Sequence, residues 1–138
     1  MTPLLILTHG DFGSALLGAA TAMMGPQKQI VALALGLDET RDTFAVRVAE
    51  EIAKFPSQPL ALVDIACGTP WNVAVLGGCC KQGDVLAGVS LPILLEALTL
   101  RESLGPVQLA IELKKRAPDC LQRAVELLAR PGEGAECP

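Results

Sequence analysis

The stretch PLLILTHGDFGSALLG, residues 3–18, joins an apolar run to a glycine-containing turn and then to a second apolar segment. Residues 4–7 predict a buried strand, and residues 13–25 predict a helix after it. His9, the single histidine of the chain, would then lie at the carboxyl end of the first strand, where open α/β sheets gather their chemistry. Imidazole changes protonation near neutral pH and can act as a nucleophile. Position alone makes His9 a candidate for chemistry or for a packing or capping role.

Length and composition predict one compact domain. The chain has 138 residues, of which 51% are hydrophobic, which suits a single full core. We expect this domain to span residues 1–130, because residues 131–138 are rich in glycine, proline and glutamate and are typical of a flexible tail. No apolar stretch reaches the roughly 20 residues that a membrane span needs, and no basic segment precedes an apolar core as in a secretory signal. The hydrophobicity therefore indicates a sheet covered on both faces and a buried subunit contact, without direct membrane insertion.

The charge balance argues against a nucleic-acid partner. The chain carries 11 basic and 15 acidic side chains, for a net charge of −4, and only 3% of its residues are aromatic. Nucleic-acid binding usually needs basic patches and stacking aromatic side chains. A mildly acidic chain is compatible with a positively charged protein partner.

The cysteines indicate reduced thiols in the cytoplasm. Their number is odd and no secretion signal accompanies them. No pair has the C-x-x-C spacing of a zinc site, so we expect no metal. Cys67 lies in a candidate active loop, where it could be a nucleophile, but a small packing residue is the favoured interpretation. The five are Cys67, Cys79, Cys80, Cys120 and Cys137.

Apolar runs alternate with amphipathic segments along the chain, which indicates parallel strands, right-handed crossovers and helices on both faces of a sheet. Residues 120–129 fit either a helix or an extended edge segment. Strands are predicted at residues 4–7, 30–35, 60–65 and 85–89. Helices are predicted at residues 15–24, from Asp38 or Thr40 to before Pro56, from Pro70 to about residue 80, from Pro92, and at residues 106–116.

Asp64 interrupts the apolar run LALVDIA of the third strand. Burying a lone carboxylate is costly, so Asp64 needs a partner or a site open to water. If the strand order is 2-1-3-4, the first and third strands are neighbours, and His9 and Asp64 could meet at the switch point of the sheet. An aspartate that accepts the imidazole N–H fixes the tautomer and leaves the other ring nitrogen free and more basic.

The loop after Asp64 adds a third element to this candidate site. Gly68, Thr69 and Pro70 lead into a helix, and the first backbone N–H groups of a helix favour an anion. The Thr69 hydroxyl could add a hydrogen bond. If this helix end points at His9, it would hold a phosphoryl group on the imidazole. Together, these features predict phosphohistidine chemistry.

Three other function classes remain open from the residues. A flavodoxin-like protein that binds flavin or a nucleotide would use the loop THGDFGS, which lacks the expected run of hydroxyl side chains. A receiver-like domain would phosphorylate Asp64 with the help of an acidic cluster, but here Asp11 stands alone. A regulatory module could use His9 as a phosphorylation switch that reports to a target outside transport.

Three motifs resemble the mannose-type enzyme IIA (mannose/fructose/sorbose family) of the bacterial sugar phosphotransferase system. They are ILTHGDFGSAL at residues 6–16, LVDIACGTPWNVA at residues 62–74 and AGVSLPILLEAL at residues 87–98. The family typically shows a strand that ends in T/S-H-G, then D-x-x-G-G-S-P-x-N, then G-x-N-x-P-M/L-L. All three occur in order and at similar spacing, so the resemblance covers about the first 115 residues. The same domain type occurs in the phosphotransfer subunit of dihydroxyacetone kinases.

The resemblance implies a fold as well as a family. It implies an α/β, flavodoxin-like, doubly wound and mainly parallel sheet of order 2-1-3-4, with helices on both faces. Known members are homodimers that exchange a carboxy-terminal antiparallel edge strand, which would fall in residues 120–129.

The resemblance also implies roles for individual residues. His9 matches the phosphorylated histidine, Asp64 the aspartate that orients it, and Thr69 a serine. Gly10, Gly68, Thr69 and Trp71 would then hold the phosphoryl group. Two residues depart from the pattern. Cys67 replaces a glycine, and Ser90 replaces an asparagine that precedes the later proline.

The implied function is that of a cytoplasmic phosphotransferase subunit. It would accept a phosphoryl group from the phosphocarrier protein HPr on His9 and pass it to an enzyme IIB partner for sugar uptake. No metal or organic cofactor is expected, because both ends of the transfer are phosphohistidines.

Overall fold

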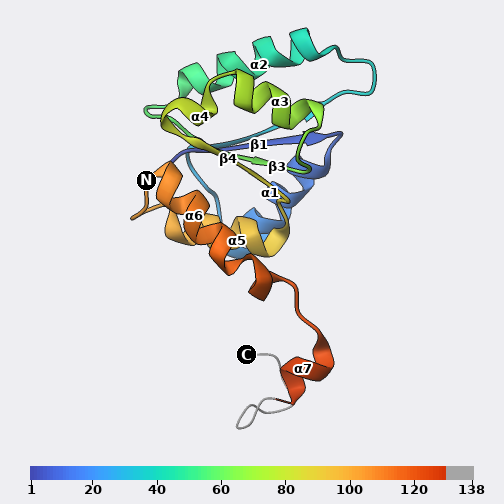
Figure 1. Ribbon diagram of the computed structural model, residues 1–138, viewed down its shortest axis with the longest axis vertical. Coiled ribbons are helices and arrows are strands. Elements are labelled where there is room, and N and C mark those ends of the chain that lie inside the picture. The colour runs from blue at the N-terminus through green and yellow to red at the C-terminus, as the bar shows by residue number, and fades with distance from the viewer. Residues whose placement is uncertain (130–138) are drawn as a thin grey trace.

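The computed structural model describes residues 1–129 and contains a parallel sheet with helices on both faces (Figure 1). The strand order is β2-β1-β3-β4, as predicted, and every neighbouring pair is parallel. β1 and β3 therefore form the centre of the sheet. The strands are β1 (Leu4–His9), β2 (Ile30–Leu35), β3 (Leu60–Val63) and β4 (Asp84–Ala87).

Alternate residues of β1 supply the two halves of the core, because successive side chains of a strand point to opposite faces. Leu4 and Ile6 pack against α1 (Phe12–Met24), α5 (Leu91–Leu100) and α6 (Pro106–Arg116). Leu5 and Leu7 pack on the other face, against Phe44 and Val48 of one helix and Val73 of another. Those helices are α2 (Arg41–Lys54) and α3 (Thr69–Leu76), with the short α4 (Cys79–Gln82) beside them. Figure 1 shows the sheet between these two helical layers.

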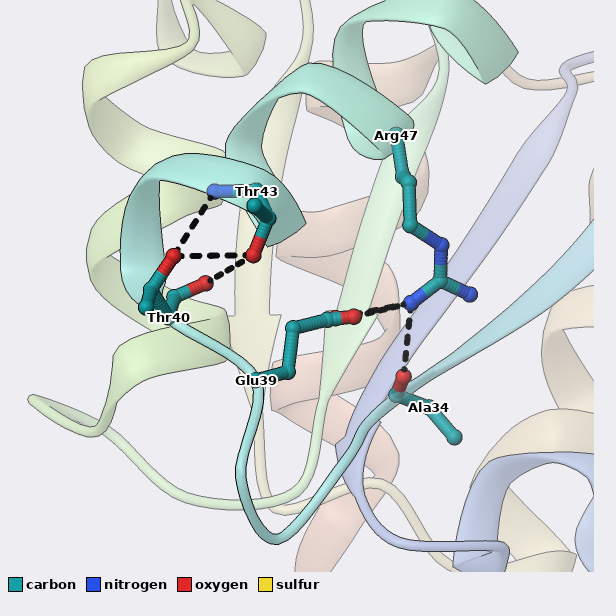
Figure 2. Close-up of polar contacts among 5 residues, drawn as sticks. All are labelled: Ala34, Glu39, Thr40, Thr43 and Arg47. Carbon is teal, nitrogen blue, oxygen red and sulfur yellow. Dashed lines mark hydrogen bonds and ion pairs between the residues drawn. The ribbon is translucent and has the colours of Figure 1, made fainter.

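Helix ends follow the signals in the sequence. Gly25 ends α1 after Met24 and has φ +83°. Glycine adopts a positive φ more easily than other residues do. Of the two candidate caps for α2, Thr40 is the one used, because its hydroxyl oxygen accepts the Thr43 N–H at 3.2 Å (Figure 2). Such a cap satisfies one of the free donors of the first helical turn.

Several boundaries differ from the predicted ones. β3 ends at Val63, so Asp64 follows the strand instead of lying inside it. β4 occupies Asp84–Ala87 and stops two residues before the predicted end. The helix predicted from Pro70 to about residue 80 is broken into α3 and α4, because Gly78 has φ +92° and interrupts the helical backbone.

The carboxy-terminal segment is helical in the described part of the chain. A 3-10 turn, η1 (Ala117–Cys120), precedes α7 (Ala124–Leu128), which lies away from the sheet in Figure 1. Of the two alternatives for residues 120–129, the structure has a helix at Ala124–Leu128, preceded by three residues without regular structure. The antiparallel edge strand is absent from residues 1–129, where β4 forms the edge of the sheet. The tail expected at residues 131–138 lies outside the described residues.

Within residues 1–129, no helix is both long enough and apolar enough to cross a bilayer.

Candidate functional site

A buried threonine fixes the turn that follows β1. The Thr8 hydroxyl accepts the Gly13 N–H at 2.8 Å and donates to the Gly10 carbonyl at 3.2 Å. Gly13 allows this close approach, because a Cβ there would lie 2.9 Å from Cγ2 of Ile6. Gly10 has φ +56°, and its N–H donates to the Leu35 carbonyl of β2 at 3.0 Å. The chain therefore leaves β1 in one conformation, with His9 as the last residue of the strand.

His9 and Asp64 are in direct contact, although 55 residues separate them in the sequence. Nδ1 of His9 lies 2.7 Å from Oδ2 of Asp64, and the same oxygen accepts the backbone N–H of His9 at 2.8 Å. The other oxygen, Oδ1, accepts the N–H of Ile65 at 2.8 Å. The imidazole is 52% exposed and the carboxylate only 15% exposed. The predicted meeting of these two side chains is thus present, at the carboxyl ends of the two central strands.

The environment of Asp64 determines which nitrogen of His9 carries the proton. Burial acts to raise the pKa of the Asp64 carboxyl, but hydrogen bonds from the His9 backbone, the His9 ring and the Ile65 N–H outweigh it. The net result is a pKa below the ordinary value. Asp64 is therefore a carboxylate at neutral pH and only accepts hydrogen bonds. Nδ1 of a neutral His9 must be the donor, which leaves a lone pair on Nε2.

The loop between β3 and α3 passes directly beside the imidazole. A Cβ on Gly68 would lie 3.1 Å from Cε1 and 3.8 Å from Nε2 of His9. Cys67 has φ +65°, a left-handed conformation that favours glycine. Its carbonyl accepts the Asn72 side-chain amide at 3.4 Å. Thr69 is the first residue of α3, so this helix begins next to His9 and turns its N-terminal end toward the site.

The side chains of Trp71 and Ser90 have structural contacts of their own. Trp71 packs against the core cluster of its face and lines a cavity along β4 together with Ala110 and Lys114. Ser90 caps α5, because its hydroxyl oxygen accepts the Ile93 N–H at 3.4 Å. In the loop before Ser90, the backbone N–H of Gly88 donates to the Asp64 carbonyl at 3.2 Å.

Comparisons with known proteins identify the family. The family model described as "PTS system fructose IIA component" matches residues 3–110, which is most of the chain. The chain belongs to this EIIA family. It is therefore a component of the sugar phosphotransferase system (PTS), with a part in phosphotransfer and sugar transport.

Two sequence relatives and one solved structure show how far the similarity of this EIIA chain extends. It is 34% identical to the fructose-specific EIIA component of Bacillus subtilis over 133 residues, covering 94% of this chain and 91% of the relative. It is 29% identical to the mannose-specific EIIAB component of Escherichia coli over 143 residues, covering 98% of this chain and 44% of that protein. The crystal structure of an EIIA component from Streptococcus agalactiae has the same fold, with a TM-score of 0.83 at 22% identity, covering 91% of this chain and 99% of that one.

Sequence reasoning missed two residues that shape the EIIA site, Thr8 and Gly13. Both act on the turn after β1, where the Thr8 hydroxyl accepts the N–H of Gly13. A signal was present, because Thr8 is a polar residue inside an otherwise apolar strand and is fully buried. Buried hydroxyls are almost always hydrogen-bonded, so a threonine directly before His9 indicates a local anchor.

Proposed function

We propose that this EIIA chain carries a phosphoryl group on Nε2 of His9, received from phosphorylated HPr and passed to a histidine of an enzyme IIB. The observation that carries the proposal is the 2.7 Å contact between Nδ1 of His9 and Oδ2 of Asp64. That contact leaves the opposite ring nitrogen with a free lone pair. An exposed imidazole in that state is a nucleophile that a protein donor can reach.

The transfer is an in-line displacement between two ring nitrogens. Nε2 of His9 attacks phosphorus, a new P–N bond forms, and the P–N bond of the donor histidine breaks as its electron pair returns to the donor ring. The phosphorylated His9 ring gains positive charge and keeps its proton on Nδ1. Asp64 stabilises that charge through the existing hydrogen bond. Positioning and electrostatic stabilisation are the main contributions that a protein makes to phosphoryl transfer.

The start of α3 would bind the transferred phosphoryl oxygens. Gly68 lies against the imidazole, and Thr69 and Trp71 belong to the first turn of α3, where backbone N–H groups favour anions. Thr69 would add its hydroxyl, and Trp71 would contribute its backbone N–H. The N–H of Gly10 already donates to Leu35, so we assign Gly10 the conformation of the turn instead of a phosphate contact.

The exposure of His9 and the relatives support protein partners on both sides of the transfer. Its side chain is 52% exposed, which suits a partner that presents its own phosphohistidine. The Escherichia coli relative is named an EIIAB component, and this chain covers 44% of it. We therefore propose that the acceptor for this EIIA is a B unit that carries the same phosphohistidine chemistry.

The decisive experiment is phosphorylation by purified phospho-HPr, followed by mapping of the modified residue. The wild-type chain should acquire one acid-labile phosphate on His9, and His9→Ala should acquire none while its circular dichroism stays unchanged. Acid-labile phosphate retained by His9→Ala, or a wild-type chain that phospho-HPr does not label, would refute the proposal.

We further propose that the chain forms a homodimer through its carboxy-terminal segment. Leu121, Val125 and Leu128 are exposed apolar side chains around α7, and a second subunit would remove them from water. Light scattering after gel filtration should give twice the chain mass. The triple substitution of these residues by Ser should give the mass of a monomer.

A further inference from the structure

Three exposed apolar side chains follow the carboxyl ends of β1 and of its two neighbouring strands, the edge of the sheet where His9 lies. Phe12 follows β1, Leu37 follows β2 and Ile65 follows β3, each within three residues of the end of its strand. Their exposed fractions are 47%, 105% and 60%. Because the strands are parallel, these loops lie at the same edge of the sheet. Single exposed apolar residues are ordinary, but three gathered around one reactive group indicate an interaction surface.

Contacts place these three loops next to the imidazole. Leu35 is the register partner of His9, and its carbonyl accepts the N–H of Gly10, so Leu37 lies two residues from this pairing. Cγ2 of Ile65 and Cε1 of His9 both approach the Cβ position of Gly68, at 3.2 and 3.1 Å. Phe12 begins α1 directly after the turn. The three side chains therefore belong to the rim of the site that holds His9.

The loop that carries Leu37 is held in place from α2. Arg47 donates to the Ala34 carbonyl at 3.2 Å, to Oε2 of Glu39 at 2.8 Å, and also contacts Oε1 of Glu39 (Figure 2). Thr40 then caps α2 at the end of the same loop. Figure 2 shows the loop bracketed by these two sets of contacts. A fully exposed leucine on an anchored loop loses less entropy when a partner binds it.

Charged side chains in the same loops are mainly acidic. Asp11 and Asp38 are exposed at this edge, as is Asp42 in the first turn of α2, together with the cations Arg41 and Arg47 of the same helix. The charge of Glu39 is matched by Arg47. An acidic rim around apolar side chains complements a protein surface with an apolar centre and basic groups around it, and it repels an anionic membrane surface.

We propose that Phe12, Leu37 and Ile65 form the docking patch for the phosphohistidine-bearing donor protein, and that Asp11, Asp38 and Asp42 attract its basic rim. The proposal rests on the function proposed above and deepens it, because it names the surface that brings donor phosphorus to Nε2 of His9. Phosphoryl transfer from a protein then depends on side chains that never touch the phosphoryl group.

The test compares a protein donor with a small one. Leu37→Ala is the main variant, and Leu76→Ala is its control, because Leu76 is 69% exposed at the far end of α3. With phospho-HPr, Leu37→Ala should raise KM about tenfold and Phe12→Ala should act in the same direction. With phosphoramidate, a donor without a docking surface, both variants should label His9 at the wild-type rate.

A second experiment tests the acidic residues around the patch separately. The double variant Asp38→Asn/Asp42→Asn should slow labelling by phospho-HPr at low salt and lose this difference at high salt, because screening removes steering. If Leu37→Ala and Leu76→Ala have the same KM for phospho-HPr, the docking proposal is overturned and the proposed function is not. A wild-type chain labelled by phosphoramidate but not by phospho-HPr would overturn the docking and the HPr donor, and labelling by neither would overturn the His9 function itself.

Discussion

Polar groups occupy both ends of this sheet, and the two ends treat them differently. At the amino end, Arg101 is a cation with only 1% of its surface exposed. Its guanidinium donates to the Gln29 carbonyl at 3.3 Å and to Oε1 of Gln27 at 3.2 Å, and its carbonyl accepts the Thr2 N–H at 2.8 Å. Desolvation lowers the pKa of Arg101. This end is closed to water.

At the carboxyl end, the corresponding polar pair is open to water on one side. Asp64 is mostly covered, whereas His9 is half exposed. Both ends use hydrogen bonds to backbone and side chains and both leave polar atoms without a partner, but Nε of Arg101 is buried whereas the His9 ring is exposed to an incoming molecule. The difference teaches that a fully buried charged group indicates a structural role. A partly buried charged group beside an exposed base indicates a candidate reactive site.

The largest effect is expected at the closed end. Arg101→Ala should lower the free energy of unfolding by about 3 kcal/mol, because it leaves a cavity and carbonyl oxygens without donors. Urea unfolding measures this loss, and phosphorylation of the variant at low temperature should continue. Arg123→Ala is the control, since its side chain is 71% exposed and should change stability by less than about 0.5 kcal/mol. A stable variant that no longer accepts phosphate would reverse the roles assigned to the two ends.

Asp64→Asn should slow phosphorylation of His9 by about 10- to 100-fold while the fold persists. An Asn with its amide nitrogen toward Nδ1 of His9 would favour the tautomer with its proton on Nε2, which removes the nucleophile. An Asn turned the other way would lack the negative charge that stabilises the phosphorylated ring. Asp84→Asn is a matched control, because both carboxylates accept the next backbone N–H at 2.8 Å. Rapid-quench labelling measures both variants, and equal rates would exclude the orienting role.

Gly68→Ala should slow phosphorylation about fivefold, because the added Cβ would lie 3.1 Å from Cε1 of His9 and displace the imidazole slightly. Gly18→Ala is the control, since a Cβ there meets nothing within 4 Å and alanine favours its helix. Labelling kinetics with one donor at fixed concentration measure both. A Gly68→Ala variant that reacts at the parent rate would show that the loop yields without moving His9.

The smallest effect concerns pH. The pKa of Asp64 is lower in the folded chain than its ordinary value, so its ionised form stabilises the fold above the ordinary pKa. That contribution is lost as pH falls through the folded pKa, below about pH 4. The stability gap between wild type and Asp64→Asn, measured by urea unfolding, should therefore shrink as the pH falls from 5 to below 4. A gap that grows on acidification would contradict this sign.

Much of the fold could be predicted because its strands are short apolar runs between glycine and proline. The run at Ile30–Leu35 matches β2, and Pro106–Arg116 matches α6. The predicted boundaries of elements were wrong where tertiary contacts determine them. β3 ends at Val63 because the side chain of Asp64 binds His9 and Ile65, which a run of apolar letters does not reveal. The same holds for α7, whose five residues fit a helix or a strand.

The contact between His9 and Asp64 could be predicted from the sequence, but the residues that hold the site in place could not. His9 and Asp64 stand out because each is a polar residue at the end of an apolar run, and parallel pairing brings such ends together. Thr8 acts through hydrogen bonds to a turn, and its partner Gly13 carries no side chain. The backbone of Cys67 is left-handed, which explains why the family pattern has glycine there. No local rule for a cysteine predicts that conformation.

One oxygen, Oδ2 of Asp64, accepts two hydrogen bonds from the same residue, one from the main-chain amide of His9 and one from its ring. The Asp64 side chain thus makes the last hydrogen bond between the two central strands. If the Asp64 side chain moves away, this hydrogen bond and the one to the imidazole break together. Solvent exchange of the backbone amide hydrogen of His9 therefore reports how often the imidazole loses its contact with Asp64. Opening of the sheet at this end and loss of the orienting contact on His9 are therefore coupled, and exchange of the His9 amide hydrogen measures both.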